Sequence, residues 1–477
     1  MEQKEKAHLS KKYEQELMEK AKKTSVKEAC AYSFMDGFGL QYITPYAIAA
    51  GASNYHIGLL NSIPSLFGNL SQLLTLKAMK KWSRKKITFI AVFLQAIMWL
   101  ALIVAGSFYL FFNIKTSLSA YLIVIIYTLL ILFGAFGGPA WSSWMKDLVT
   151  KNIGNYFGKR ARISGLVALI CMIIAGFILD YFKQTKVFIG FIILFSIAFI
   201  GRLVSSLLVK KQYEPEFKED ERAYFSIFEF VKKMAYNNFG RFVLYFALVS
   251  LTTCIASPFF TVYMLKNLNF SYTFYMLTIL SSSITTLIAM PLWGRFADKY
   301  GNLKVMRLTG VFVPIIPFLW LFSVLLIPFN KTIILIYIML IQAASGIAWA
   351  GFNLCAGNFI YDAVSRQRMA ICVSYFNVIN GFGILVGALL GGYISSIKFN
   401  FWGLTPLYFI FILSGLARAG VYFFMKDKIQ EVREVKQINV KSEIKNKIQK
   451  DISKIFNSIS LKKFSESIES SLKFAPL

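Results

Sequence analysis

The sequence predicts an all-α polytopic membrane protein in which twelve transmembrane helices form two pseudo-symmetric halves of six. Three observations predict this fold class. Of the 477 residues, 56% are hydrophobic and only 16% are charged, whereas about 25% are charged in an ordinary soluble domain. Apolar runs close to the ~20 residues that cross a bilayer recur along the whole chain. Short polar motifs also recur at a spacing of 215 to 218 residues, as expected of an internal repeat.

The apolar runs divide the chain into five parts. The runs lie at 28–50, 55–76, 87–111, 119–145, 163–181, 188–209, 240–265, 272–296, 305–328, 332–361, 370–396 and 403–425. We therefore expect an N-terminal segment at 1–27, a first six-helix half at 28–209, a linker at 210–239, a second six-helix half at 240–426 and a tail at 427–477.

The three parts outside the halves are polar. Residues 1–27 are rich in Glu and Lys, which favours a surface helix, and they lack the apolar core of a cleavable signal peptide. In the linker, Tyr224–Met234 is amphipathic and is expected to lie on the membrane surface. In the tail, one helix face would carry Ile444, Ile448, Ile452, Ile455 and Ile459. That pattern fits a membrane-surface or partner-binding helix and fits a partly ordered, solvated tail equally well.

The net charge of +28 is explained by membrane topology. One set of alternate loops holds 23 Lys and Arg, at 77–86, 146–162, 210–233, 295–307 and 366–368, whereas the opposite set holds six. The positive-inside rule places the richer set, with both termini and the linker, in the cytoplasm. We therefore expect a multi-pass plasma-membrane protein whose cytoplasmic face contacts anionic lipids, with no nucleic-acid partner.

Several function classes lack the motifs that they need. The five cysteines lie in or beside apolar runs, without the spacing of a metal site or redox pair. His8 and His56 are too few for a metal site, so neither a metal nor a cofactor is expected. The chain contains no G-x-x-x-x-G-K-[ST] motif and no soluble segment long enough for an ATPase. A membrane transferase would need an acidic cluster for metal and diphosphate, and no D-D-x-x-D-like cluster occurs.

The two halves repeat one another. Arg202 and Arg418, near the ends of spans 6 and 12, are 216 positions apart, and a lysine follows each of them eight residues later. The sequence Asp147-Leu-Val-Thr-Lys, at the end of span 4, corresponds to Asp362-Ala-Val-Ser-Arg at the end of span 10, with an offset of 215. The loops after spans 2 and 8 correspond with an offset of 218. Agreement among three separate matches predicts two homologous halves.

A charged loop, Trp293–Lys304, joins spans 8 and 9. Its residues match G-x-x-x-D-[RK]-x-G-[RN]-x-[KR] at Gly294, Asp298, Lys299, Gly301 and Lys304. The loop resembles the signature loop of the major facilitator superfamily, and the resemblance extends over residues 28–426. Residues 139–149 and 156–160 resemble spans 4 and 5 of a bacterial branch of unassigned permeases in that superfamily, and residues 353–364 resemble its span 10.

The resemblance implies a secondary active transporter, not an enzyme, that moves a small molecule by alternating access. Spans 1, 4, 7 and 10 would line its central cavity, and the chain would act as a monomer. Uptake and efflux both fit. The alternative is a non-transporting membrane receptor or scaffold that acts through the basic tail.

The resemblance also implies a gate at the cytoplasmic face. Asp298 would cap the start of span 5, and Arg295 or Lys304 would pair with Asp362, when the cytoplasmic side is closed. The gating set is Gly294, Arg295, Asp298, Lys299, Gly301, Lys304, Asp362 and Asp147. In the corresponding first loop, Leu76 and Ser83 stand at the positions of Gly294 and Gly301, and Lys80 stands at the position of Asp298. An intact latch is therefore expected only in the second half.

Asp36 is the main candidate for function. It lies about a third of the way into span 1, where a carboxylate is costly unless it is paired, protonated or wetted. Burial favours its neutral form, which suits a proton carrier. A carboxylate that only hydrogen-bonds another helix is the alternative, and uniport and sodium coupling remain open.

Neutral polar and aromatic side chains accompany Asp36 in the predicted substrate and proton path: Gln41, Tyr46, Trp141, Trp144, Asn353, Asn358, Asn377 and Asn380. Their alternative role is packing and hydrogen bonding between helices. Because no Lys or Arg lies deep in spans 1, 4, 7 or 10, cationic or neutral substrates are favoured over anions. Arg202 and Arg418 are expected to snorkel to the cytoplasmic surface and to have a structural role in both halves.

Glycine and proline predict where helices bend or touch. Pro45 and Pro258 occupy corresponding places in spans 1 and 7 and predict bends there. Gly134–Pro139 is expected to interrupt span 4. Gly383, Gly387 and Gly391, four residues apart, predict that a second helix packs closely on span 11.

Overall fold

The computed structural model describes residues 2–112, 117–149, 153–183, 186–215, 226–328, 330–365, 368–397 and 405–433. Every regular element in these ranges is a helix. The amphipathic tail pattern at 444–459 lies outside the described residues.

The first half contains spans 1 to 6. Span 1 consists of α1 (Glu2–Phe38), the 3₁₀ turn η1 (Leu40–Tyr42) and α2 (Ile43–Ala49). Spans 2 to 6 are α3 (Asn54–Ala78), α4 (Arg84–Phe112), α5 (Ser117–Leu148), α6 (Ile153–Lys183) and α7 (Val187–Lys211). The linker contains α8 (Ile227–Lys233), whose Phe228 and Val231 are exposed, in keeping with the predicted amphipathic helix.

The second half repeats this order. Span 7 consists of α9 (Asn238–Cys254), α10 (Ser257–Val262) and the π turn η2 (Tyr263–Asn267). Span 8 is α11 (Tyr272–Tyr300), and span 9 consists of α12 (Asn302–Phe312), α13 (Ile315–Phe322) and η3 (Ser323–Leu326). Spans 10 to 12 are α14 (Lys331–Ala363), α15 (Met369–Ser396) and α16 (Pro406–Met425).

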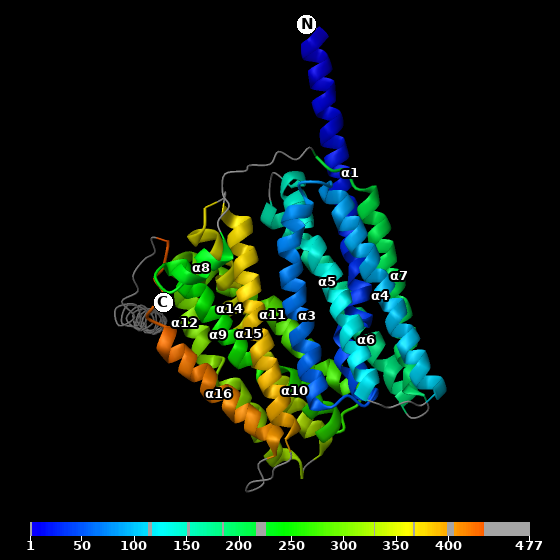
Figure 1. The fold of residues 1–477 in the computed structure, drawn as a ribbon, viewed down its shortest axis with the longest axis vertical. Helices are drawn as coiled ribbons and strands as arrows, with labels where there is room; N and C mark the ends of the chain where they lie inside the picture. The colour runs from blue at the N-terminus through cyan, green and yellow to red at the C-terminus, as the bar shows by residue number, and fades with distance from the viewer. Residues whose placement is uncertain are drawn as a thin grey trace, which may run out of the picture.

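The described helices confirm the predicted fold class. Ten of the spans are long and apolar enough to cross a membrane by themselves, and α1 with α2 and α3 supply the other two of the predicted twelve. Figure 1 shows the two halves as neighbouring bundles, with α3 and α15 side by side between them. The start of α1 projects beyond the first bundle.

The N-terminal segment is continuous with the first half. Helix α1 runs without a break from Glu2 to Phe38, so no structural boundary occurs at residue 27. Its second part is not only a surface helix, because Ala21 and Ser25 are buried. Ser25 donates a hydrogen bond to the sulfur of Met145 on α5, which fixes this part of α1 to the bundle.

The predicted bends in spans 1 and 7 are confirmed. Regular α-helix ends at Phe38 in span 1 and at Cys254 in span 7, and Pro45 and Pro258 lie in the first turn of the helices that follow, α2 and α10. The predicted interruption of span 4 is wrong, because α5 is continuous and contains Pro139 within it. The glycines of α5 have a different role, which the candidate site makes clear.

The glycines of span 11 lie against the backbone of α9. A Cβ atom at Gly383, Gly387 or Gly391 would lie 2.3, 2.0 or 2.1 Å from the carbonyl oxygen of Ala247, Leu251 or Ile255 respectively. These distances are far shorter than any real contact, so only glycine permits this approach. Helix α15 is thereby fixed to its own half while its other side packs on α3.

We call the end of the bundle that carries α8 the linker face and the opposite end the far face. At the far face, both oxygens of Asp180, at the end of α6, accept hydrogen bonds from the backbone N–H groups of Tyr272 and Thr273 (2.7 and 2.8 Å). Asp180 therefore caps α11 across the two halves. Asn54 also donates to the carbonyl oxygen of Ser395 (3.1 Å), so the halves are tied together at this face.

Candidate functional site

A cavity of about 260 Å³ lies in the first half between α1 and α5. Helix α1 packs mainly on α6 and α7, whereas α5 packs mainly on α3 and α4, which leaves a gap between them. The residues that line the cavity come from five helices: Glu28, Tyr32, Thr88, Val92, Gly134, Gly137, Gly138, Trp141, Arg160, Arg202 and Val209.

Glu28 is the central charge of this cavity. It is only 5% exposed, and its Oε2 pairs with Nη2 of Arg160 at 2.7 Å. Its Oε1 accepts a hydrogen bond from the Ser205 hydroxyl (2.8 Å) and lies 3.9 Å from Nη1 of Arg202. A buried carboxylate is tolerated only when paired in this way.

Arg202 does not snorkel, contrary to the sequence-based expectation. Its side chain is buried, its Nε donates to Oε1 of Gln95 (2.7 Å), and its guanidinium lies 5.1 Å from the ring of Tyr32. The polar partners inside the bundle replace water, so the side chain has no need to reach the surface.

Arg418, the counterpart of Arg202, is also buried, and it has different partners. Its Nη1 and Nη2 donate to the carbonyl oxygens of Val313 and Thr253 (3.2 and 3.3 Å). These carbonyls lie where α12 and α9 end inside the bundle, and helix C-terminal carbonyls attract a cation. Arg418 therefore stabilises the breaks in spans 7 and 9, which is the structural role expected for it.

The glycines of α5 make room for this polar cluster. A Cβ atom at Gly134 would lie 2.2 Å from Nε2 of Gln95, whereas one at Gly138 would meet nothing within 4 Å. Gly134 therefore admits the side chain that binds Arg202, and Gly138 leaves the cavity open. The cluster of glycines is a visible signal in the sequence, but it marks close packing and open space within a continuous helix rather than a helix break.

Trp141, one of the residues of the predicted path, lines this cavity. Its ring is 4.7 Å from the guanidinium of Arg160, whose Nε donates to the carbonyl oxygen of Ser25 (3.3 Å). Glu28 and Arg160 were missed by the sequence reasoning because both lie at predicted span ends, where charge is common.

Asp36 lies one helical turn beyond Tyr32 on α1 and is partly exposed. Gln41 donates to its Oδ1 at 3.3 Å, so the structure brings together two residues of the predicted path. No ion pair joins Asp36 to any residue that the structure describes.

Two of the predicted path residues lie in the core instead. The Tyr46 hydroxyl donates to the carbonyl oxygen of Leu102 (3.2 Å), and its ring is fully buried among phenylalanines. Trp144 is equally buried and donates to the carbonyl oxygen of Tyr213 (3.0 Å). Both are large side chains that satisfy one polar atom inside the bundle.

The four asparagines have separate surroundings. Asn377 donates to Oε1 of Gln72 (3.0 Å) and so links α15 to α3 across the halves. Asn380 has a buried Oδ1 without a hydrogen-bond partner in the described part of the chain. On α14, Asn353 is exposed and Asn358 is partly exposed.

The signature loop is bound by the chain that follows α16. Nε of Arg433 pairs with Oδ2 of Asp362 at 2.7 Å, and its Nη1 lies 3.7 Å from Oδ1 of Asp298. Asn302 also donates to Oδ2 of Asp362 (2.7 Å). In this conformation Arg433, rather than Arg295 or Lys304, is the partner of Asp362, because the chain returns across the loop after span 12.

Other members of the gating set are exposed or local. Asp298 is 78% exposed and contacts Arg433 rather than the start of α6. Arg295 is exposed, and the ammonium groups of Lys299 and Lys304 lie 4.5 and 5.9 Å from the ring of Tyr300. A Cβ atom at Gly294 would make only an ordinary contact, 3.8 Å from Cδ2 of Leu354 on α14.

The structure explains why residue 301 is a glycine. Its φ is +94°, a value that strains other residues, and a Cβ atom there would lie 2.5 Å from Oε2 of Glu431. That same oxygen accepts a hydrogen bond from the backbone N–H of Leu303 (2.8 Å), so Glu431 caps α12.

The first half has a latch of its own, contrary to the expectation that only the second half does. Arg84, 1% exposed, pairs with Asp147 and with Glu214. Glu214 also accepts hydrogen bonds from the backbone N–H groups of Arg84 and Lys85 (2.9 and 3.2 Å). Glu214 and Glu431 are 217 positions apart, so corresponding glutamates cap α4 and α12. The repeat was detectable from the sequence. The first loop lacks the aspartate of the signature motif, however, and so gave no sign of the latch that Arg84 forms with Asp147 and Glu214.

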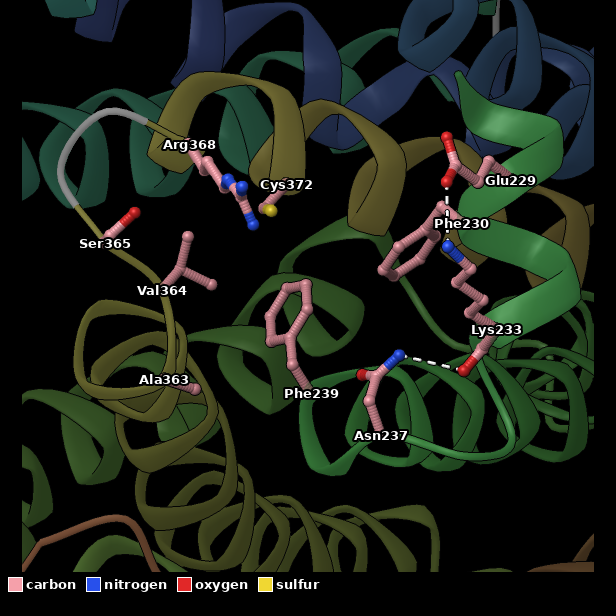
Figure 2. Close-up of a pocket in the computed structure, with 10 residues that line it drawn as sticks. All are labelled: Glu229, Phe230, Lys233, Asn237, Phe239, Ala363, Val364, Ser365, Arg368 and Cys372. Carbon is pink, nitrogen blue, oxygen red and sulfur yellow. Dashed lines mark hydrogen bonds and ion pairs between the residues drawn. The ribbon is translucent and has the colours of Figure 1, made fainter. Parts of the chain in front are cut away.

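Two larger cavities, of about 610 Å³ each, lie at the faces of the bundle. The one in Figure 2 is at the linker face, between α8 and the junction of α14 with α15. Its Glu229 and Lys233 pair with each other and are exposed. The other includes Asp180 and Lys183 at the far face. Neither contains a buried charge cluster like that around Glu28.

The chain belongs to the major facilitator superfamily. The family model described as Major Facilitator Superfamily matches residues 29–256 and again 242–463, which agrees with two homologous halves. The protein is therefore a multi-pass membrane protein of a secondary-transporter family, not of an enzyme family. A comparison with curated protein sequences finds no match.

Solved structures of transporters have the same fold. A point mutant of the nucleoside transporter NupG is similar with a TM-score of 0.66 and 15% identity, over 85% of this chain and 100% of that chain. A bacterial homologue of the iron transporter ferroportin, in an inward-facing state, gives 0.62 and 12%, over 86% and 99%. A bacterial homologue of the human lysosomal transporter Spinster, inward-facing and unoccupied, gives 0.53 and 14%, over 87% and 98%. At such low identity these likenesses concern the fold alone.

Proposed function

We propose that this protein moves a small molecule across the plasma membrane by alternating access and that Asp36 carries a coupled proton. The observation that carries the proton role is the isolation of Asp36: a partly exposed carboxyl group inside a span, with an amide as its hydrogen-bond partner. Such a group can gain and lose a proton without breaking an ion pair.

The contacts between the halves support alternating access. Asp180 ties α6 to α11 at the far face, whereas the ionic latches of Arg84 and Arg433 at the linker face each lie within one half. With the linker face in the cytoplasm, as the charge count predicts, this arrangement corresponds to an inward-open state. In the outward-open state the Asp180 contacts would break and Asp298 would approach the start of α6.

The remaining features of the proposal follow from the sequence. Both termini lie in the cytoplasm and the basic linker face contacts anionic lipid. That the chain works as a monomer rests on the family resemblance alone. The path of substrate and proton includes Asp36, Gln41 and Trp141, with Asn353 and Asn358 on α14 of the second half.

The proton role is tested with purified protein in liposomes, using a substrate identified by a thermal-shift screen of metabolites and drugs. We expect Asp36→Asn to lose accumulation driven by a pH gradient while it keeps exchange of labelled for unlabelled substrate, because exchange needs no net proton movement. Glu229→Gln, on the exposed linker helix, is the matched control and should behave as the wild type.

Accumulation by Asp36→Asn at the wild-type level under a pH gradient would contradict the proton role. Accumulation by the wild type that follows a sodium gradient, or no ion gradient, would instead indicate sodium coupling or uniport.

A further inference from the structure

We propose that the cavity between α1 and α5 recognises an anionic small molecule, whose carboxylate or phosphate group binds Arg160 and Arg202. This inference rests on the proposed transport function and specifies its class of substrate.

The charges around the cavity are unbalanced. Arg160 and Arg202 carry two positive charges, and Glu28 is the one carboxylate among the described residues that line the cavity. Asp36 lies a turn away and pairs with neither arginine. A largely buried cluster with an excess positive charge is costly unless an anion completes it.

Both guanidinium groups keep donors available to a ligand. Arg160 uses Nη2 for Glu28 and Nε for Ser25, and Arg202 uses Nε for Gln95 and Nη1 for Ser205 and Glu28. Nη1 of Arg160 and Nη2 of Arg202 have no hydrogen bond to any residue that the structure describes. A guanidinium has five N–H donors in a planar fork, which matches the oxygens of a carboxylate or phosphate.

The surroundings fix the orientation of these forks. Trp141 covers one face of the Arg160 guanidinium, and Tyr32 covers one face of that of Arg202. Gln95, admitted by Gly134, holds the Nε edge of Arg202. Such prior ordering lowers the entropy lost when a ligand binds.

The cavity volume limits the ligand. About 260 Å³ is below the roughly 300–1,000 Å³ of sites for drug-sized ligands, so a small acid, or the anionic group of a larger molecule, fits. The Arg202–Glu28 distance of 3.9 Å is longer than the Arg160–Glu28 distance of 2.7 Å. We therefore place the incoming anion on the Arg202 side of Glu28.

An anionic substrate is the opposite of the cationic or neutral substrate expected from the sequence. Spans 1, 4, 7 and 10 contain no deep Lys or Arg, but the two arginines reach the cavity from α6 and α7, which are spans 5 and 6. Counting charges on the four cavity-lining spans alone could not reveal them.

The test measures thermal stabilisation of the purified full-length protein by matched anionic and neutral probes. The pairs are benzoate with benzamide, succinate with succinamide, and glycerol 3-phosphate with glycerol, each titrated at constant ionic strength. We expect at least one anion, and not its neutral partner, to raise Tm in a saturable manner. Arg160→Gln and Arg202→Gln should weaken that binding at least tenfold, while Arg162→Gln, an exposed neighbour on α6, should leave it unchanged.

Glu28→Gln provides a test in the opposite direction. Removing the competing carboxylate should tighten anion binding several-fold, because the guanidinium groups lose their own anion. An arginine cluster with a purely structural role would give unchanged or weaker binding in this variant.

Either of two results would overturn the proposal: no saturable anion effect in the wild type, or an anion effect that survives in both Arg160→Gln and Arg202→Gln. Gradient-driven uptake of a neutral or cationic compound without anion binding would refute the anionic substrate and leave the transport function intact. Anion binding without any transport of the bound anion in liposomes would refute transport and leave the binding site.

Discussion

At the scale of single residues, the two halves have acidic residues at corresponding positions but pair them with arginines from different parts of the chain. Corresponding glutamates, Glu214 and Glu431, cap α4 and α12, and corresponding aspartates, Asp147 and Asp362, bind an arginine. That arginine is Arg84 within the first half's own loop, whereas in the second half it comes from the chain beyond α16. The latches therefore differ in burial, which determines what each contributes.

Substitution of the two arginines should reveal this difference. Arg84→Gln leaves two carboxylates without a buried partner, so we expect it to lower the free energy of unfolding by about 3 kcal/mol. Arg433, 39% exposed, has solvent-screened ion pairs, so Arg433→Gln should cost about 1 kcal/mol or less.

Thermal and denaturant unfolding of both variants in the same detergent measures the difference. Equal losses of stability in Arg84→Gln and Arg433→Gln would show that burial does not distinguish the latches.

At the scale of elements, small residues decide which helices approach one another. Gly134 on α5 admits Gln95, and the glycines of α15 lie against carbonyls of α9. Spacing alone predicted the second contact, because glycines four residues apart form one face of a helix. It could not predict the first, because the side chain that fills the space comes from α4, whose distance from α5 is set only by tertiary packing.

Gly134→Ala tests the first of these contacts. The added methyl group must displace Gln95, so we expect a loss of about 1–3 kcal/mol from overpacking, together with weaker anion binding through Arg202. Gly138→Ala, in the same helix but in open space, should keep wild-type stability. Comparison of Tm values for the two variants is the measurement, and an equal effect of both would refute the role of Gly134.

The cap of α11 by Asp180 belongs to the same scale. Asp180→Ala removes a carboxylate that accepts two backbone N–H groups across the halves. We expect this substitution to destabilise the far-face-closed state by about 1–2 kcal/mol. The population should therefore shift toward the far-face-open state.

Reaction of a single cysteine at Met276, which is buried where α11 packs on α6 near the far face, with a membrane-impermeant maleimide reports this shift in Asp180→Ala. Faster labelling than in the same cysteine variant with Asp180 intact is expected. An unchanged rate would indicate that Asp180 does not hold the far face closed.

At the scale of the whole molecule, the sequence was most informative about the number of spans, the repeat and the bends near Pro45 and Pro258. These depend on local hydrophobicity and backbone chemistry. The sequence was least informative about side-chain partners. The residues that pair with Arg160, Arg202 and Arg433 are far from them in the sequence, and only the fold brings them together. Tyr46 and Trp144 show the converse: polar side chains on cavity-lining spans can face the core.

Alternating access involves the whole molecule, because one face must be closed whenever the other is open. The direct test uses spin labels on two cysteine pairs, each pair spanning the halves, after replacement of the five native cysteines. The far-face pair is Tyr181→Cys with Leu325→Cys, and the linker-face pair is Lys159→Cys with Tyr361→Cys. All four native side chains lie on exposed helix surface.

Distance distributions from double electron–electron resonance in lipid nanodiscs are the decisive measurement. We expect two populations for each pair, with the far-face distance increasing under the conditions, of pH or bound substrate, that shorten the linker-face distance. A single distance for each pair under all conditions, or distances that change in the same direction at both faces, would contradict transport by alternating access.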